Sequence, residues 1–557
     1  MTTTKRFRTT FGENVFRFKY AQGPSDTWDQ LADRVVEDVC GTRWGTQHAL
    51  MSAGDRGELA EHIKHMRFLP GGRYLYYAGR PYKAYNNCYL LRAEEDTREE
   101  WSAVTWRAMS CLMTGGGIGI DYSRLRGAGK ALSRTGGTAS GPIPLMFAIN
   151  EIGRNVMQGG SRRSAIYASL NWQHADISDF LKSKNWSEVI REQKAKDFNF
   201  PAPLDMTNIS VNYDDAAIGN YLHEPTVAAQ QLAANSVFLQ NVRQALKTGE
   251  PGFSFNFGDK QNETLRNACT EVTSEDDSDV CNLGSVNLGN IDSLEQFKDV
   301  VHLASKFLVC GTLRADLPYE KVYKVREKNR RLGLGLMGIH EWLLKRNYRY
   351  EVNEALSSWL GTYRTESEAA ANAHCERYYI SRPVAYRAIA PTGSIGILAG
   401  TTTGIEPAFA TAYKRRFLTD GTKWRYQFVV DGTAAALVEQ GINPADIETS
   451  IDLAYDPERR IKFQADVQDF VDMSISSTIN LPSWGTKGNN EGLVGSFANT
   501  LARYAGRLRG FTCYPDGARG GQPLTAVDYE DAIKHKDTIF EETDVCEYTG
   551  HGGSCGV

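Results

Sequence analysis

Three residues whose side chains can share one reaction lie close together in the middle of the chain: Asn267, Cys269 and Glu271. They stand at positions i, i+2 and i+4. Because alternate side chains of an extended segment point to the same side, we expect all three to contact one small ligand. A carboxylate so close to a thiol raises the pKa of the thiol and suppresses the thiolate, which makes Cys269 a poor nucleophile. The spacing favours a sulfur that reacts as a radical.

This segment resembles the finger loop of ribonucleotide reductases, in which Asn-x-Cys-x-Glu is followed by a second cysteine that opens the run Cys-Asn-Leu-Gly-Ser. Here the second cysteine is Cys281. Many relatives have Asn-Pro-Cys-Gly-Glu, so Ala268 and Thr270 are departures that keep the three reacting side chains. Further family motifs follow in the same order along the chain, at residues 68–70, 87–88, 135–142, 158–163, 208–211, 331–338, 390–395, 404–407, 478–482 and 514–523.

The resemblance implies a role for each of these residues in reducing a ribonucleotide at C2′. Cys269 is expected to carry a thiyl radical that abstracts the 3′ hydrogen, and Glu271 to take the proton of the 3′ hydroxyl. Asn267 is expected to hydrogen-bond the ribose hydroxyls. Cys88 and Cys281 are expected to deliver the electrons and to become a disulfide.

A short loop at residues 390–396 combines small residues, hydroxyls and backbone amides, which are the ingredients of a phosphate-binding turn. A Gly-rich loop by itself is more often a tight turn than a phosphate site. The resemblance favours the phosphate site and assigns Thr392, Gly393, Ser394 and Ile395 to the substrate phosphates.

The end of the chain carries a second thiol pair, Cys546 and Cys555, with three glycines between them. Such a segment buries little and loses much entropy on ordering, so we expect a mobile arm. With the finger loop, the pair favours a shuttle that passes electrons from thioredoxin or a glutaredoxin-like reductant to the Cys88–Cys281 disulfide. The alternative is a disordered tail with incidental cysteines.

Regulation is implied by the family, in which a deoxynucleoside triphosphate effector sits near a homodimer contact and acts through two loops. These loops correspond to residues 127–135 and 156–165. Asp96 and Arg126 match positions near the effector, and Arg162 matches the loop that approaches the substrate base. Each of these charged residues is equally compatible with a solvated surface position.

The radical source is indicated by residues 514–523, which resemble the adenosylcobalamin-dependent class. Relatives served by a diiron or dimanganese subunit usually have two adjacent tyrosines here, whereas Pro515 follows the radical-transfer candidate Tyr514. We therefore expect adenosylcobalamin as the cofactor. A separate ferritin-like radical subunit is the alternative, because the chain is short for the cobalamin class. A glycyl-radical enzyme and a non-enzymatic module with redox-sensing thiols are less favoured.

The composition agrees with a large α/β protein. The chain has 557 residues, of which 41% are hydrophobic, and helix-length amphipathic segments alternate with short apolar runs. The resemblance implies a ten-stranded α/β barrel with a central finger loop. We expect a helical N-terminal region without an ATP cone at residues 1–85, the barrel with its effector loops at 86–525, and a flexible redox tail at 526–557.

Charge and cysteine usage limit the partners. A net charge of −4 gives no bulk attraction to nucleic acid. The chain has no apolar run of about 18 residues and no signal-peptide pattern, so we expect no membrane segment and a cytoplasmic location, in the host if the chain is phage-encoded. None of its ten cysteines stands in Cys-x-x-Cys. We therefore expect thiols and no structural metal.

Overall fold

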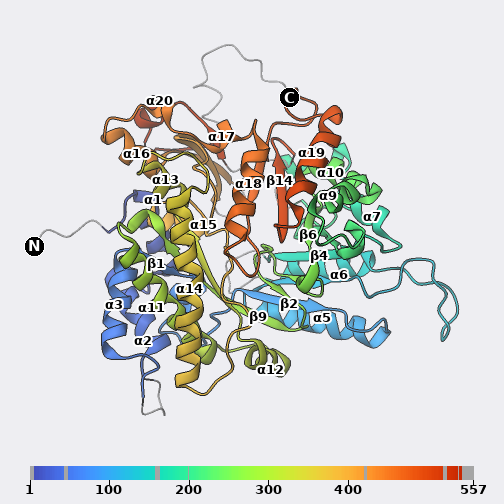
Figure 1. Cartoon of the computed structure of the whole chain (residues 1–557), viewed down its shortest axis with the longest axis horizontal. Coiled ribbons are helices and arrows are strands. Elements are labelled where there is room, and N and C mark those ends of the chain that lie inside the picture. The colour runs from blue at the N-terminus through green and yellow to red at the C-terminus, as the bar shows by residue number, and fades with distance from the viewer. Residues whose placement is uncertain are drawn as a thin grey trace, which may run out of the picture.

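The computed structural model describes residues 6–42, 48–156, 164–197, 200–419, 423–518, 524–536 and 538–541. Helices surround a central group of strands (Figure 1). The helices are α1 (Thr10–Val15), the π-helix η1 (Phe16–Tyr20), α2 (Trp28–Cys40), α3 (Ala53–Lys64), α4 (Gly72–Tyr77), α5 (Arg98–Met113), α6 (Ile143–Asn155), α7 (Ile177–Lys182), α8 (Glu188–Lys196), α9 (Pro225–Ala234), α10 (Ser236–Thr248), α11 (Leu294–Arg314), α12 (Glu320–Asn329), α13 (Ile339–Leu344), α14 (Glu354–Arg377), α15 (Gly393–Ala399), α16 (Gly432–Glu439), α17 (Ser450–Leu453), α18 (Pro457–Gln468), α19 (Val494–Ala505) and α20 (Tyr529–Lys534).

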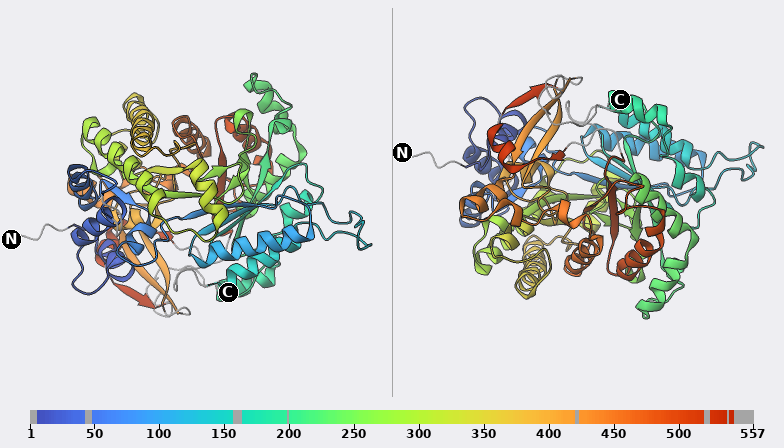
Figure 2. Two further views of the ribbon diagram at one scale, coloured as in Figure 1. Left: turned by 90° about the horizontal axis from the view of Figure 1, so that it is seen from below. Right: turned by 90° about the horizontal axis from the view of Figure 1, so that it is seen from above.

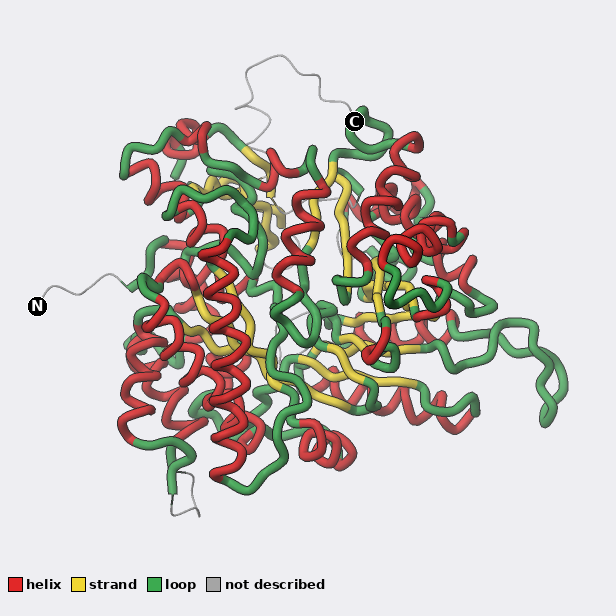
Figure 3. The backbone as a smooth tube through the Cα atoms, viewed as in Figure 1, coloured by secondary structure: helices red, strands yellow, loops and turns green. Residues whose placement is uncertain are grey.

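The central sheet has ten strands. They are β1 (Phe68–Pro70), β2 (Cys88–Arg92), β3 (Gly117–Asp121), β4 (Ile166–Asn171), β5 (Thr207–Tyr213), β6 (Gly252–Phe255), β9 (Asp279–Asn287), β10 (Leu332–Met337), β13 (Thr478–Leu481) and β14 (Gly510–Pro515). Strands β2 to β6 are parallel, and helices connect each to the next. Parallel strands need such crossovers, which cover the sheet and bury it. The strands accordingly lie in the interior, between the helices (Figure 3).

The strand order is β1-β9-β2-β3-β4-β5-β6-β14-β13, with β10 paired to β9. This mixed ten-stranded sheet confirms the predicted α/β fold class. In the described part of the chain, the named strands leave a gap between β10 and β13. Residues 385–390 cross it, because Arg387 pairs with Leu334 of β10 and Ile389 pairs with Ile475, just before β13. In the described residues these isolated bridges, and not a regular strand, lie between β10 and β13, so the named strands do not close into the predicted barrel.

Two long helices support the sheet from one side. α11 packs against α14, and it also contacts β9 and β10. Both helices begin at a side-chain cap. Ser293 accepts a hydrogen bond from the backbone N–H of Gln296 at the start of α11, and Asn353 accepts one from the backbone N–H of Leu356 at the start of α14. The N-terminal helices α2 and α3 pack against α11, as the views along the other axis also show (Figure 2).

Described segments near both ends of the sequence contact this body. β1 belongs to the predicted N-terminal region and pairs with β9 in the central sheet. Part of the predicted tail, residues 526–541, contains α20 and joins a four-stranded sheet of β15 (Leu524–Ala526), β11 (Ala412–Thr419), β12 (Lys423–Val430) and β16 (Ile539–Glu541). Residues 542–557 lie outside the described part. Among the described helices, none is both long and apolar enough to cross a membrane.

Candidate active site

The finger-loop residues lie in a tight turn at the tip of a hairpin made by β7 (Leu265–Arg266) and β8 (Thr273–Ser274). The backbone N–H of Thr270 donates to the carbonyl of Asn267 at 3.0 Å. Thr270 has φ +71°, a left-handed conformation that costs energy in a β-branched residue. The extended backbone predicted for this segment is therefore wrong, because the chain reverses direction here. The turn nevertheless brings Asn267, Cys269 and Glu271 to one cavity.

Two glycines in β3 make room for the finger loop. A Cβ on Gly119 would lie 1.7 Å from the carbonyl oxygen of Arg266, and one on Gly117 would lie 3.1 Å from the Cβ of Ala268. The loop is also held by hydrogen bonds. The side chain of Asn208 donates to the carbonyl of Ala268 at 3.3 Å. The sheet interior is thus shaped to receive this hairpin.

Buried charges fix the base of the hairpin. The Arg266 guanidinium is 1% exposed and donates to the side chain of Asn256 at 2.7 Å and to the carbonyl of Arg509 at 3.2 Å. Arg509 forms an ion pair with Glu263 at 3.0 Å. Burial alone would raise the pKa of Glu263, but Arg509 and other nearby cations lower it to about 2. The carboxylate therefore stays ionised and paired.

The cavity at the tip of the finger loop has a volume of about 610 Å³. Eight predicted site residues line it, namely Cys88, Asn267, Cys269, Glu271, Thr392, Gly393, Ser394 and Ile395. Of its thiols, Cys269 is half-buried and Cys88 is 3% exposed. Cys269 is thus the sulfur that a molecule in the cavity reaches most readily.

Glu271, Cys88 and Asn267 form a buried hydrogen-bonded group. The thiol of Cys88 lies 3.8 Å from Oε1 of Glu271, and Nδ2 of Asn267 donates to the Cys88 sulfur at 3.0 Å. Burial raises the pKa of Glu271 to about 7. Burial, and then the nearby Glu271, raises the pKa of Cys88 well above its ordinary value. The group therefore holds a protonated thiol beside a carboxyl that titrates near neutrality.

Cys88 and Cys281 occupy facing positions in neighbouring strands. They are register partners in the antiparallel pairing of β2 with β9. Facing residues in such a pair have Cα atoms about 4.5–5.5 Å apart, which lies within the range that a disulfide spans. Both are thiols here, and Cys281 is fully buried outside the set of cavity-lining residues. Closing a disulfide would require no change of register.

The predicted phosphate loop also lines the cavity. Thr392 has φ +52°, and its hydroxyl accepts a hydrogen bond from the backbone of Gly404 at 2.8 Å. Lys19 also lines the cavity and donates to the hydroxyl of Ser394 at 3.0 Å. Lys19 and a second cavity cation, Arg73, were not predicted from the sequence. Neither lies in a motif that signals a site, and Lys19 is far from Ser394 in sequence.

The remaining predicted residues that the structure describes are not among the residues that line the cavity. Asp96 and Arg126 form an ion pair at 2.5 Å. The loop that carries residues 127–135 projects from the body at the right of Figure 1 and is pinned by a bridge between Ala131 and Thr138. Tyr514 lies on β14 and is half-buried. Arg162, Cys546 and Cys555 fall outside the described residues.

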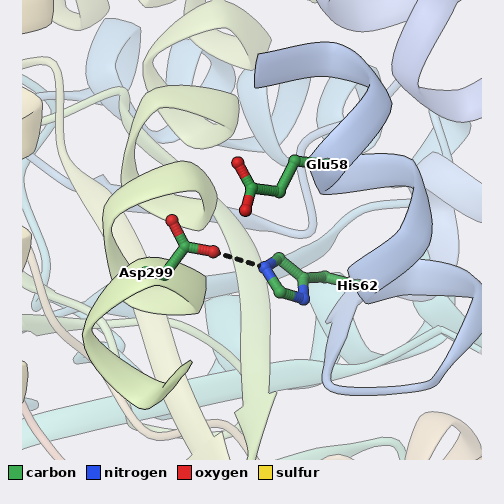
Figure 4. A group of neighbouring side chains, drawn as sticks. All are labelled: Glu58, His62 and Asp299. Carbon is green, nitrogen blue, oxygen red and sulfur yellow. Dashed lines mark hydrogen bonds and ion pairs between the residues drawn. The ribbon is translucent and has the colours of Figure 1, made fainter. Parts of the chain in front are cut away.

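One group of potential metal ligands occurs among the described residues, on the N-terminal helical side of the molecule. Glu58 and His62 of α3 and Asp299 of α11 offer ligand atoms within 4.8 Å of one another (Figure 4). None of the three lines the cavity. His62 already pairs with Asp299 at 2.7 Å. A hydrogen bond between two helices accounts for this arrangement.

Comparison with known proteins gives a consistent result. The family model described as "Ribonucleotide reductase, barrel domain" matches residues 86–204, 207–365 and 382–494. A "Vitamin B12-dependent ribonucleoside-diphosphate reductase" of Mycobacterium tuberculosis is 27% identical, over 93% of this chain and 80% of that protein. A "Putative adenosylcobalamin-dependent ribonucleoside-triphosphate reductase" of Mycobacterium phage D29 is 26% identical, over 74% of this chain and 68% of that protein.

A solved structure shares the fold. The crystal structure of a B12-dependent (class II) ribonucleotide reductase superposes with a TM-score of 0.70 at 16% sequence identity, covering 96% of this chain and 95% of that one. At this level of identity the likeness concerns the fold alone.

Proposed function

Because the chain belongs to the family of ribonucleotide reductase barrel domains, we propose that it reduces ribonucleotides to 2′-deoxyribonucleotides through a thiyl radical on Cys269. One observation carries this proposal. Cys269, Glu271, Asn267 and Cys88 meet in one cavity, and Cys281 faces Cys88 across two strands. These are the groups that a radical reduction of a ribose requires.

The position of each of these residues indicates its role in the reaction. The Cys269 radical removes the 3′ hydrogen, and Glu271, with a pKa of about 7, accepts the proton of the 3′ hydroxyl at neutral pH. Asn267 is held by the backbone N–H of Val272, which donates to its Oδ1 at 2.9 Å. Cys88 and Cys281 supply two electrons and two protons as the 2′ hydroxyl leaves as water. The two thiols thereby become one disulfide. The reaction balances when Cys269 returns its hydrogen to C3′, which regenerates the thiyl radical, and Glu271 returns its proton to the 3′ oxygen.

We propose adenosylcobalamin as the source of the radical. When bound, it supplies a radical by homolysis of its cobalt–carbon bond. The half-buried Cys269 fits this chemistry, since it is the thiol most open to the cavity. Phe18, Tyr76 and Tyr77 give the cavity an aromatic wall against which a flat macrocycle can pack. The names of the mycobacterial and phage relatives support this source over a ferritin-like subunit.

We propose a homodimer that joins through α5. Trp106, Met109 and Met113 lie at i, i+3 and i+7 on this helix and are 55%, 37% and 64% exposed. Phe147 on the neighbouring α6 is 37% exposed. Exposed apolar residues gathered on adjoining helices are typical of a protein interface. An effector near Asp96 would lie close to the start of α5, the same helix that carries this contact in its second half.

An activity assay tests the function. The purified chain is incubated with a dithiol reductant, ribonucleoside di- or triphosphates and deoxynucleotide effectors, with and without adenosylcobalamin. We expect deoxynucleotide only when the cofactor is present. Cys269→Ser should bind nucleotide and give no product, because an O–H bond is too strong to replace the thiol. Product formed equally by Cys269→Ser would refute the assignment of the radical, and product that requires a metal-loaded partner would refute the assignment of the cofactor.

A further inference from the structure

Lys19 places a positive charge at the predicted phosphate loop. It lies on η1, outside the residues that the family model matches. Its Nζ donates to the hydroxyl of Ser394 at 3.0 Å, and both residues line the cavity. The contact joins two parts of the chain separated by 375 residues. The N-terminal region therefore contributes directly to the wall of the active-site cavity.

The π-helix fixes where Lys19 points. Phe16 and Tyr20, its first and last residues, are each 1% exposed, and Phe16 packs against the rings of Phe7 and Trp28. The residues between them face outward, with Phe18 89% exposed at the cavity. Two buried aromatic anchors thus hold a turn whose exposed side faces the cavity. Single π-helical turns are frequent at functional sites.

Close helix packing keeps this turn beside the phosphate loop. α1 runs directly into η1 and packs on α15, the helix that starts at Gly393. A Cβ on Gly12 of α1 would lie 2.7 Å from the carbonyl oxygen of Leu398 on α15. The absence of a side chain at this point allows the two backbones to approach so closely. The position of Lys19 relative to Ser394 is therefore set by the fold.

The charge balance of the cavity indicates what Lys19 recognises. The loop residues 392–395 are uncharged, while a nucleotide polyphosphate brings several negative charges. Of the described residues that line the cavity, Lys19 and Arg73 are basic. Arg73 is 8% exposed, and its guanidinium donates to the carbonyls of Ala84 and Thr114. Lys19 is exposed and already contacts the loop, so it is the cation best placed to meet a phosphate.

We propose that Lys19 binds the terminal phosphate of the ribonucleotide and so makes binding depend on the number of phosphates. This inference rests on the proposed function, which makes a ribonucleotide the ligand. An ammonium is a compact charge with three donors on a flexible stem, so Lys19 can leave Ser394 and follow a phosphate oxygen. The loop would then position the phosphate chain, and Lys19 would contact the terminal phosphate.

Equilibrium binding without any radical cofactor tests the proposal. Dissociation constants are measured for a ribonucleoside, its monophosphate and its diphosphate, with wild type, Lys19→Met and Lys19→Arg. We expect Lys19→Met to weaken diphosphate binding by about tenfold or more, the size of one hydrogen bond to a charged group, with the bare ribonucleoside unaffected. Lys19→Arg should keep most of the diphosphate affinity.

The control removes a lysine charge elsewhere. Lys324 on α12 has a 70% exposed side chain, and Lys324→Met should bind all three ligands as wild type does. The proposal would be overturned if Lys19→Met bound the diphosphate as tightly as wild type does. It would also be overturned if this variant lost as much affinity for the bare ribonucleoside as for the diphosphate, or if wild type bound no diphosphate. A wild type that binds the diphosphate through Lys19 but makes no deoxynucleotide would refute the proposed function and leave this inference standing.

Discussion

At the scale of single residues, Glu271 lines the proposed active site and lies in an environment that is unfavourable for a charge. It is 1% exposed, and its Oε2 has no hydrogen-bond partner among the described residues. Burial raises its pKa from 4.5 to about 7. The folded protein therefore holds this proton more tightly than the unfolded chain. The resulting stability is present at low pH and is lost as the pH rises through 7.

Replacement of Glu271 by glutamine should separate stability from activity. Above pH 7 the variant avoids a buried ionised carboxylate, so its free energy of unfolding should exceed that of wild type by up to about 3 kcal/mol. At pH 4.5 the two proteins should be nearly equal. Deoxynucleotide formation should fall by at least about a hundredfold, the usual contribution of a general base. Chemical denaturation at pH 5 and pH 8 measures the first effect, and a difference that does not change with pH would contradict it.

The residue types of the active site were predictable, but their surroundings were not. Asn267, Cys269 and Glu271 stand together in the sequence, and the structure brings them to one cavity with Cys88. The pattern gave no sign of Lys19, because its partner Ser394 lies in a distant segment and only the packing of α1 on α15 joins them. Contacts of this kind depend on tertiary structure alone.

At the scale of elements, β3 and the finger loop depend on each other. Gly119 faces the carbonyl of Arg266 with no space for a methyl group. The backbone of the hairpin must therefore move if this residue gains a Cβ, and backbone shifts of this kind cost roughly 1–3 kcal/mol.

We predict that Gly119→Ala destabilises the protein by roughly 1–3 kcal/mol and lowers turnover more than nucleotide binding. Turnover is more sensitive because Cys269 sits at the tip of the displaced hairpin. The matched control is Gly361→Ala in α14, where a Cβ meets nothing within 4 Å. That change should stabilise the helix by about 0.5–1 kcal/mol. Thermal unfolding and steady-state assays compare the two variants. Equal changes in stability and in turnover would show that the close approach of Gly119 to the carbonyl of Arg266 is unimportant.

The conformation of the finger loop shows where a local pattern is insufficient. The spacing of Asn267, Cys269 and Glu271 suggested a strand, but the loop turns between β7 and β8, with Thr270 at positive φ. Positive φ is usually signalled by glycine, and a threonine gives no such sign. The hairpin is fixed by the buried Arg266 and by β3. Both lie outside residues 267–271, the segment from which the extended backbone was predicted.

At the scale of the whole molecule, the predicted α/β class is confirmed by a sheet of ten strands. The short apolar run at residues 117–120 indicated one of its strands and lies in β3, whereas the similar run at residues 395–398 lies in helix α15. Their order was not readable from composition or periodicity, because β9 pairs with β1, β2 and β10 from distant parts of the chain. The ten-stranded arrangement was implied only by the family motifs.

The exposed face of α5 predicts the assembly. Met113→Lys should shift the proposed dimer towards monomer by at least about tenfold in its dissociation constant, because it buries a charge in an apolar contact. Tyr455→Lys is the control, since this residue is 75% exposed elsewhere on the surface. Sedimentation measures both variants. A wild type that is monomeric at all concentrations, with and without effector, would refute the proposed contact.

The C-terminal thiols predict how the enzyme is recharged. Cys546→Ser combined with Cys555→Ser should abolish multiple turnover with thioredoxin, while a single turnover from pre-reduced protein survives. A small dithiol that enters the cavity should restore multiple turnover. Rapid-quench measurement of the first turnover checks this, and its loss in the double variant would give the tail another role.

The facing positions of Cys88 and Cys281 also constrain the order of events during catalysis. Cys88 lines the cavity, whereas Cys281 is fully buried and does not. If the proposed Cys88–Cys281 disulfide forms, an incoming thiolate can therefore attack it only at the sulfur of Cys88, from the space proposed for the nucleotide. Substrate and reductant must take turns, which gives ping-pong kinetics. At a fixed reductant concentration, the rate should rise and then decline as nucleotide concentration increases, because bound nucleotide blocks the entry of the thiolate.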